Sequence, residues 1–212
     1  MVEVVKFGGS LLSRADYSCA LAAWLSAQPA PVHRVFVVGG GEPVEALRRV
    51  DARYPMGAEA AHWRAISLMQ ENARCLGDQL PQLVRAETLA RLRARLATPG
   101  NSLLLPEAFL REEEPYAPGT PLPTGWHVTS DSIAARLAVL LGARRLRLLK
   151  SRSPSSAELC DWNVASRRGL VDPFFPRLAG DIPQVTCELL PPLRHEVAER
   201  KLVDIPGAGQ LP

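Results

Sequence analysis

The chain has 212 residues, a formal net charge of +3 and a hydrophobic content of 47%, enough for one compact domain with a substantial core. Its arginines are dispersed apart from Arg144, Arg145 and Arg147, so the charge pattern argues against a nucleic-acid partner. No apolar run reaches the ~18 residues of a membrane span, and Lys6 interrupts the apolar N-terminal run expected of a signal peptide. We therefore expect a cytoplasmic protein with no membrane partner.

Cysteine and histidine spacing offers no metal or disulfide pattern. Cys19, Cys75, Cys160 and Cys187 are scattered, with no Cys-x-x-Cys pair, and the four histidines show no metal-ligand spacing. We expect buried, reduced thiols and no metal ion bound by the chain itself.

The N-terminal part of the chain alternates strand and helix patterns. The β-branched run Val2–Lys6 predicts a buried strand, and apolar residues at helical spacing follow over Leu11–Ala27. A second apolar run at Arg34–Val38 is followed by a helical pattern over Glu42–Val50. Consecutive glycines follow each strand, and this alternation is typical of a parallel sheet.

The remainder continues the same alternation. Residues 112–125, which are rich in proline and glycine, predict a surface loop or flap. A parallel sheet binds its ligands beyond the C-terminal ends of its strands, so we expect one α/β domain over residues 1–212 with its site at that edge. The other predicted elements are helices at 57–76, 87–96 and 128–141, strands at 102–105, 144–150, 184–190 and 201–205, and a serine-rich loop at 151–156.

Lysine is rare in this chain. Only Lys6, Lys150 and Lys201 occur among 25 basic residues. Either lysine was kept where a compact point charge is needed, or an arginine-rich composition leaves three by chance. Lys6 and Lys150 each end a predicted strand, so both cations are expected at the ligand-binding edge.

Two glycine loops follow the first two predicted strands. Gly8-Gly9 and Gly39-Gly40-Gly41 could let backbone amides approach a phosphate closely, with a helix N-terminus behind each loop. The alternative is a pair of plain tight turns, although three consecutive glycines exceed what a turn requires. Glu42 is favourable at a helix start under either interpretation.

Thr129-Ser130-Asp131-Ser132 precedes a strongly apolar helical pattern. Ser or Asp is an expected N-cap at such a position. The functional alternative is that Asp131 points into the cleft and orients the lysines or a metal–nucleotide complex.

Three motifs together resemble the amino acid kinase family, which includes acetylglutamate, carbamate, uridylate and isopentenyl phosphate kinases. They are Val-Lys-Phe-Gly-Gly-Ser-Leu-Leu at 5–12, Val-Val-Gly-Gly-Gly-Glu at 37–42 and Thr-Ser-Asp-Ser-Ile-Ala-Ala at 129–135. Their order and spacing carry the resemblance, which spans residues 2–151. It implies a three-layer αβα sandwich around a mostly parallel sheet.

The resemblance also implies roles for individual residues, with ATP and Mg²⁺ as cofactors. Asp131 would organise the two lysines, Lys6 would hold ATP phosphates, and Lys150 would support the transferred phosphoryl group. The residues expected at the ATP phosphates are Gly8, Gly9, Ser10 and Ser151, and those expected at the acceptor are Gly39, Gly40, Gly41, Trp126, Thr129 and Ser130.

The chain departs from the family after Lys150. Leu-Leu-Lys-Ser-Arg-Ser-Pro-Ser stands where most members carry a Thr-Asp-Val-Asp-Gly-Val-Tyr-like nucleotide loop, so recognition of adenine and ribose is left open. The short length and the run Trp126–Asp131 are similar to a small subgroup that phosphorylates an aminomethylfuran-methyl phosphate for methanofuran-type cofactors. This similarity implies a furan-methyl phosphate acceptor.

Two other segments border the expected site. His62 and Trp63 suit the core or a dimer interface better than a ligand, and residues 172–176 are expected to form a packed connector, near the nucleotide in this family. We expect an ATP-dependent small-molecule kinase that forms a homodimer or higher homo-oligomer. The alternative is a non-catalytic module that binds a ligand or oxyanion on the same fold.

Overall fold

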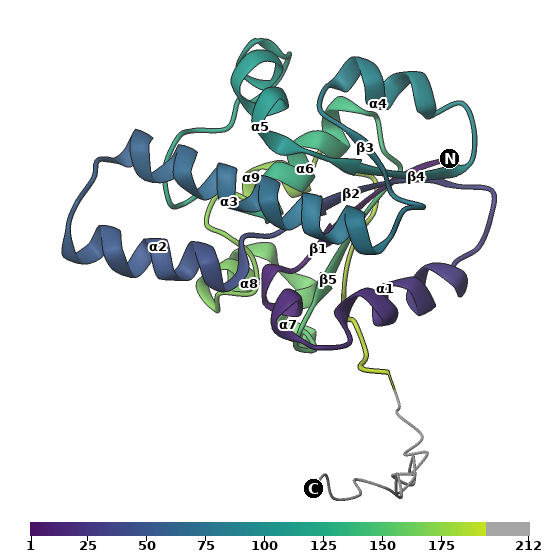
Figure 1. Cartoon of the computed structure of the whole chain (residues 1–212), viewed down its shortest axis with the longest axis horizontal. Coiled ribbons are helices and arrows are strands. Elements are labelled where there is room, and N and C mark those ends of the chain that lie inside the picture. Colours follow the sequence, from purple (N-terminus) through teal and green to yellow (C-terminus); the bar gives the residue numbers. More distant parts are fainter. Residues whose placement is uncertain (194–212) are drawn as a thin grey trace, which may run out of the picture.

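The computed structural model describes residues 1–193, which form a six-stranded sheet covered by helices (Figure 1). Every strand pairs in parallel with its neighbours, in the order β3-β4-β2-β1-β5-β6. The strands are β1 (Val2–Phe7), β2 (His33–Val38), β3 (Val84–Ala86), β4 (Gly100–Leu104), β5 (Arg145–Lys150) and β6 (Val185–Leu189). The predicted parallel sheet is thus confirmed, and the strand expected at 201–205 lies outside the described residues.

Helices cover both faces of the sheet, because alternate strand residues point to opposite sides. Val4 of β1 packs in one core cluster with Ile133 and Leu137, whereas its neighbour Val5 packs with Leu21 and Leu76 in another. The three-layer αβα sandwich is therefore confirmed. The helices are α1 (Tyr17–Ser26), α2 (Gly41–Arg53), α3 (Ala58–Gln79), α4 (Leu89–Arg95), α5 (Pro106–Ala108), α6 (Ser130–Leu140), α7 (Ser156–Cys160), α8 (Trp162–Arg167) and α9 (Pro176–Ala179), with the short turns η1 (Gly9–Ser13), η2 (Phe109–Glu113) and η3 (Glu114–Tyr116).

The helix predicted over Leu11–Ala27 is broken into η1 and α1. Arg14 has an extended backbone, its side chain donates two hydrogen bonds to Asp16, and its Nη1 donates to the Leu190 carbonyl at 2.7 Å. This contact with a segment 176 residues away fixes the break, so the local helical pattern alone could not reveal it.

The surface loop predicted at 112–125 is wrong in its first part. Residues up to Tyr116 are helical, and Glu114 is buried with its carboxylate 2.7 Å from the guanidinium of Arg136. Arg136, on α6, also donates to the carbonyls of Ala117 and Pro118. A buried ion pair therefore ties the base of this segment to the core, and the open loop begins at Ala117.

The cysteines are free, as expected, but their predicted burial is wrong for three of the four. Only Cys187, on β6, is buried, and burial raises the pKa of its thiol to about 11. Cys19, Cys75 and Cys160 lie on exposed helix surfaces, which the sequence spacing could not distinguish from core positions.

Within residues 1–193, no helix combines the length and the apolar character needed to cross a membrane.

The two glycine loops pack backbone against backbone at the ends of β1 and β2. A Cβ on Gly9 would lie 2.1 Å from the Gly41 nitrogen, and a Cβ on Gly39 would lie 2.5 Å from the Gly9 nitrogen. Asn72 of α3 donates hydrogen bonds of 2.9 Å to the carbonyls of Gly39 and Gly40. Close approach of the two loops thus requires glycine at these positions whether or not a phosphate binds.

This packing predicts that Gly9→Ala lowers the free energy of unfolding by roughly 3 kcal/mol, the upper end of the cost of overpacking, because only backbone atoms surround the new methyl group. Gly180→Ala is the matched control, since Gly180 has a helical backbone and nothing within 4 Å of an added Cβ. That variant should gain about 0.5 kcal/mol. Urea denaturation of both would measure the difference, and equal stability of the two variants would contradict the close packing.

Candidate functional site

A cleft of about 740 Å³ opens at the C-terminal edge of the sheet, where β1 and β5 end side by side. The glycine loops, α2, α3 and the start of α6 form its other walls. Eleven of the predicted site residues line it: Lys6, Gly9, Ser10, Gly40, Gly41, Trp126, Thr129, Ser130, Asp131, Lys150 and Ser151. Gly8 and Gly39 do not, because their N–H groups bond the carbonyls of Leu149 and Phe7 and extend the sheet.

Asp131 lies between the two lysines at the strand ends. Its Oδ1 atom is 3.0 Å from the Lys6 ammonium and 2.8 Å from that of Lys150. All three side chains are largely buried, and Lys150 Nζ also donates to the Leu170 carbonyl at 2.6 Å. This ion triad carries a net charge of +1, so a buried positive charge is left at the base of the cleft.

Burial governs the ionisation of the triad. Desolvation lowers the pKa of Lys6 to about 8, since the attraction of Asp131 offsets only part of that effect and Lys150 adds repulsion. Burial alone would raise the pKa of Asp131, but the two lysines hold it below its ordinary value. The carboxylate therefore stays ionised at neutral pH, while Lys6 is a cation close to its titration point.

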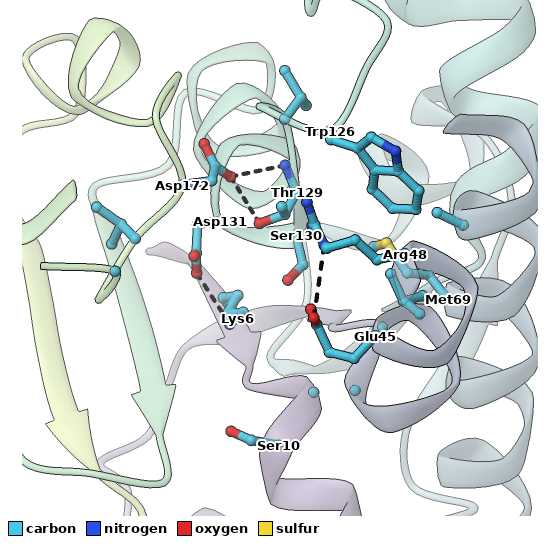
Figure 2. A pocket seen from close by; sticks show the side chains of 18 of the residues that line it. Lys6, Ser10, Glu45, Arg48, Met69, Trp126, Thr129, Ser130, Asp131 and Asp172 are labelled. Atoms are coloured by element: carbon cyan, nitrogen blue, oxygen red, sulfur yellow. Dashed lines mark hydrogen bonds and ion pairs between the residues drawn. The ribbon is translucent and has the colours of Figure 1, made fainter. Parts of the chain in front are cut away.

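The N-cap interpretation of Asp131 is wrong. Thr129 is the N-cap residue of α6, and its side chain makes no capping bond. The carboxylate of Asp172 instead accepts from the backbone N–H group of Thr129 at 2.9 Å (Figure 2). It also accepts from the backbone N–H group of Ser132 at 3.0 Å. Asp131 is consequently free to face the lysines.

One side of the cleft carries an aromatic wall formed by Trp126. Trp126 donates its indole N–H to Asp51 at 2.7 Å. Trp126 and Arg48 lie on the same side of the cleft (Figure 2), and the Arg48 guanidinium is 4.4 Å from the centre of the indole ring. The N–H of Gly125 donates to Nδ1 of His62 at 3.3 Å, and burial lowers the pKa of this imidazole. His62 is thus both a core residue and part of the cleft wall.

The opposite side of the cleft is formed by the atypical loop after Lys150. The hydroxyl groups of Ser10 and Ser151 are hydrogen-bonded at 2.8 Å, which joins this loop to the first glycine loop. Arg152 lines the cleft but forms a two-pronged ion pair with Glu158, whose carboxylate also completes a capping box with Ser155. The loop is therefore held by its own side chains.

Sequence interpretation missed two cleft residues. Arg48 follows Glu42 on the predicted helix, but its position opposite Trp126 depends on the fold. Asp172 belongs to the expected packed connector, which its burial confirms, but its contacts with α6 join segments 40 residues apart. The Asp-Pro pair was the only local signal of a structured turn.

The described part of the chain, residues 1–193, contains no group of three or more His, Cys, Asp or Glu side chains arranged to hold a metal ion. Cationic side chains and backbone N–H groups are instead the donors that suit phosphate oxygens. Magnesium in phosphoryl-transfer sites is commonly bound by one or two carboxylates together with substrate phosphates and water. The donor set fits a nucleotide that brings Mg²⁺ with it.

Comparisons with known proteins bear on the fold. No family model matches the chain, and no curated protein matches it by sequence. Solved structures do match the chain. Uridylate kinase from Archaeoglobus fulgidus matches at 17% identity and a TM-score of 0.62, and the match covers 89% of this chain and 91% of that one. UMP kinase from Ureaplasma parvum matches at 14% identity and a TM-score of 0.65, covering 89% of each chain.

Carbamate kinase from Giardia lamblia matches at 10% identity and a TM-score of 0.51, covering 89% of this chain and 93% of that one. The chain has the amino acid kinase fold. At these identities the likeness establishes the amino acid kinase fold alone, and the narrower resemblance to a furan-methyl phosphate kinase stays a prediction.

The buried cation predicts an unusual pH dependence of stability. Because the pKa of Lys6 falls from 10.5 to about 8 on folding, the unfolded chain binds more protons between these pH values, and stability gained from this group rises with pH there. The Lys6→Met variant should lack this increase of the unfolding free energy with pH. Its unfolding free energy at pH 7.5 should exceed that of the natural protein, and the difference should shrink towards pH 10.5.

Denaturant titrations of both proteins across this pH range would measure the effect. The difference between the two curves removes the titration of groups that both proteins share. Curves that ran parallel from pH 7.5 to 10.5 would mean that Lys6 keeps an ordinary pKa and is not desolvated.

Proposed function

We propose that the protein is an ATP-dependent phosphotransferase that moves the terminal phosphoryl group of ATP to a small anionic acceptor. The observation that carries this proposal is the ion triad, in which Lys6 and Lys150 share one Asp131 oxygen at the base of the cleft. A net positive charge that is buried, fixed and open to a 740 Å³ cleft suits a transferring phosphoryl group. The shared fold with small-molecule kinases supports the same conclusion.

In this proposal the chain contributes position and charge. Lys6 and Lys150 neutralise negative charge that develops on the phosphoryl oxygens, and Asp131 keeps the two ammonium groups close together despite their repulsion. Backbone N–H groups at the start of α2, which have no partner within the helix, bind oxyanion oxygens beside Gly40 and Gly41. Ser10 and Ser151 offer hydroxyl donors to the ATP phosphates.

The reaction needs no covalent intermediate on the protein. An acceptor oxygen forms a bond to the terminal phosphorus as the bond to the ADP oxygen breaks, so ADP leaves with the electron pair. A phosphate or carboxylate acceptor is already ionised at neutral pH and requires no general base. When bound with ATP, Mg²⁺ neutralises part of the phosphate charge.

The proposed acceptor is a small anion with a flat apolar body. Trp126, Ile66 and Met69 supply apolar surface to that side of the cleft, and Arg48 supplies a cation. A furan-methyl phosphate combines these properties and is our candidate acceptor. Association into a homodimer or higher oligomer stays a prediction from the family resemblance.

The alternative function is a binding module that retains an oxyanion without turnover. The observation that favours it is the loop after Lys150, in which Arg152 is paired with Glu158 and no family-type nucleotide loop is present. Consumption of ATP with candidate acceptors, compared with ATP binding alone, separates the two functions.

Asp131→Asn should lower kcat by on the order of 100-fold or more, because a neutral amide no longer holds two ammonium groups together. The variant should also lose about 3–5 kcal/mol of stability, since two buried cations lose their counter-charge. Assays therefore belong well below its melting temperature. Lys150→Arg is the companion variant: it keeps the charge, yet its planar guanidinium cannot replace an ammonium group. An unchanged kcat in folded Asp131→Asn would favour the binding module.

Arg48→Met should raise the acceptor KM about tenfold, the loss of roughly 1.4 kcal/mol of binding, while leaving the ATP KM unchanged. Methionine keeps the apolar contact with Trp126 and removes the charge, together with its ion pair of 3.7 Å with Glu45 one turn earlier on α2. Arg49→Met is the matched control, because Arg49 is the next residue on α2 and is exposed outside the cleft. Equal effects of both variants would exclude Arg48 from the acceptor site.

A further inference from the structure

Asp172 accepts hydrogen bonds from six donors on two segments of the chain. Its Oδ2 accepts from the Thr129 N–H and hydroxyl, both at 2.9 Å (Figure 2), and from the Ser132 N–H at 3.0 Å. Its Oδ1 accepts from the Ser132 hydroxyl at 2.5 Å and from the N–H groups of Phe174 and Phe175 at 3.1 and 3.0 Å. The side chain is buried, so these contacts replace its hydration.

Thr129 and Ser132, which Asp172 binds at the start of α6, stand on either side of Asp131 in the chain. The chain just before the connector also touches the ion triad, because Lys150 donates to the carbonyl of Leu170, two residues before Asp172. Residues 170–172 therefore contact both the first turn of α6, which carries Asp131, and Lys150, which is paired with Asp131.

A local cap could have satisfied the start of α6. Thr129 has the side chain for it, but its hydroxyl is directed at Asp172, and Asp131 in the first turn would otherwise be drawn to the free N–H groups. A carboxylate from a distant segment fills the capping role instead. Asp131 is thereby left free to face Lys6 and Lys150.

We propose that Asp172 is a positioning residue, which clamps the first turn of α6 to the connector and so sets Asp131 at the distance where one oxygen contacts both lysines. The inference rests on the proposed phosphotransferase function for its catalytic consequence. Asp172 lines the cleft, but its oxygens are directed at six donors of the protein, so it acts through Asp131.

Replacement by asparagine tests the clamp sharply. The amide NH₂ of Asp172→Asn must occupy either the Oδ2 or the Oδ1 position. Each of these positions faces two backbone N–H groups that cannot turn away. In one orientation the stranded donors are the Thr129 and Ser132 N–H groups at the start of α6, and in the other they are the Phe174 and Phe175 N–H groups. Either way one side of the clamp is released, so the start of α6 is no longer held to the connector. Glu3→Gln is the control, because Glu3 is also a buried carboxylate and lies on β1, three residues before Lys6. Its partner is Arg34, with which it forms an ion pair outside the triad.

The experiment compares steady-state kinetics and lysine NMR signals of the natural protein, Asp172→Asn, Asp131→Asn and Glu3→Gln. With only three lysines in the chain, Cε-labelled lysine gives three assignable signals. We expect Asp172→Asn to lower kcat by on the order of 10- to 100-fold, as a displacement of about 1 Å can, with both KM values within about threefold. Its Lys6 and Lys150 signals should move towards those of Asp131→Asn.

Glu3→Gln should lower the melting temperature while keeping the kcat and lysine signals of the natural protein. If Asp172→Asn does not fold, Ser132→Ala removes one bond to the same carboxylate and should shift the same two signals by less. Natural lysine signals and natural kcat in the Asp172 and Ser132 variants would overturn the proposal and leave Asp172 a structural cap. Failure of the natural protein to consume ATP would overturn the proposed function only, because the lysine signals are read without nucleotide.

Discussion

The site depends on one carboxylate oxygen that two buried ammonium groups share. Like charges of this kind repel strongly away from water, and Asp131 is the only anion that contacts both lysines among the described residues. The arrangement holds because the lysines sit on adjacent strands, β1 and β5, while the aspartate is supplied by the first turn of α6. A phosphate oxygen entering the cleft would offset the remaining net positive charge. The buried charges that destabilise the folded protein would therefore favour binding of an anionic ligand.

Two sets of contacts fix the positions of the strand ends and of the first turn of α6. At the ends of β1 and β2, the two glycine loops pack backbone against backbone, and Asn72 joins the loop after β2 to α3. At the start of α6, Asp172 takes the place of a local cap. Both sets consist of hydrogen bonds and close contacts among buried groups, which tolerate little displacement. A phosphoryl group placed between them would meet a preorganised surface.

The two halves of the cleft differ in how they are stabilised. On one side, Trp126 is held by Asp51 and stacked by Arg48, so the wall is composed of side chains from α2 and from the loop before α6. On the other side, the loop after Lys150 is stabilised by Arg152 and Glu158, which satisfy one another. The proposed centre for phosphate recognition lies between the halves, where the triad and the glycine loops meet. A phosphotransferase and an oxyanion-binding module would both use that centre.

Sequence alone determined the parallel sheet and placed Lys6 and Lys150 at the C-terminal ends of its strands. Buried β-branched runs, consecutive glycines after strands and two rare lysines at strand ends are local signals with a direct physical meaning. Only tertiary structure decided that Asp131 faces the lysines rather than capping its helix, because the competing carboxylate of Asp172 lies 40 residues beyond Ser132 in the chain. It likewise decided the break after Ser13 and the buried pair of Glu114 and Arg136, since each depends on partners that no local pattern encodes.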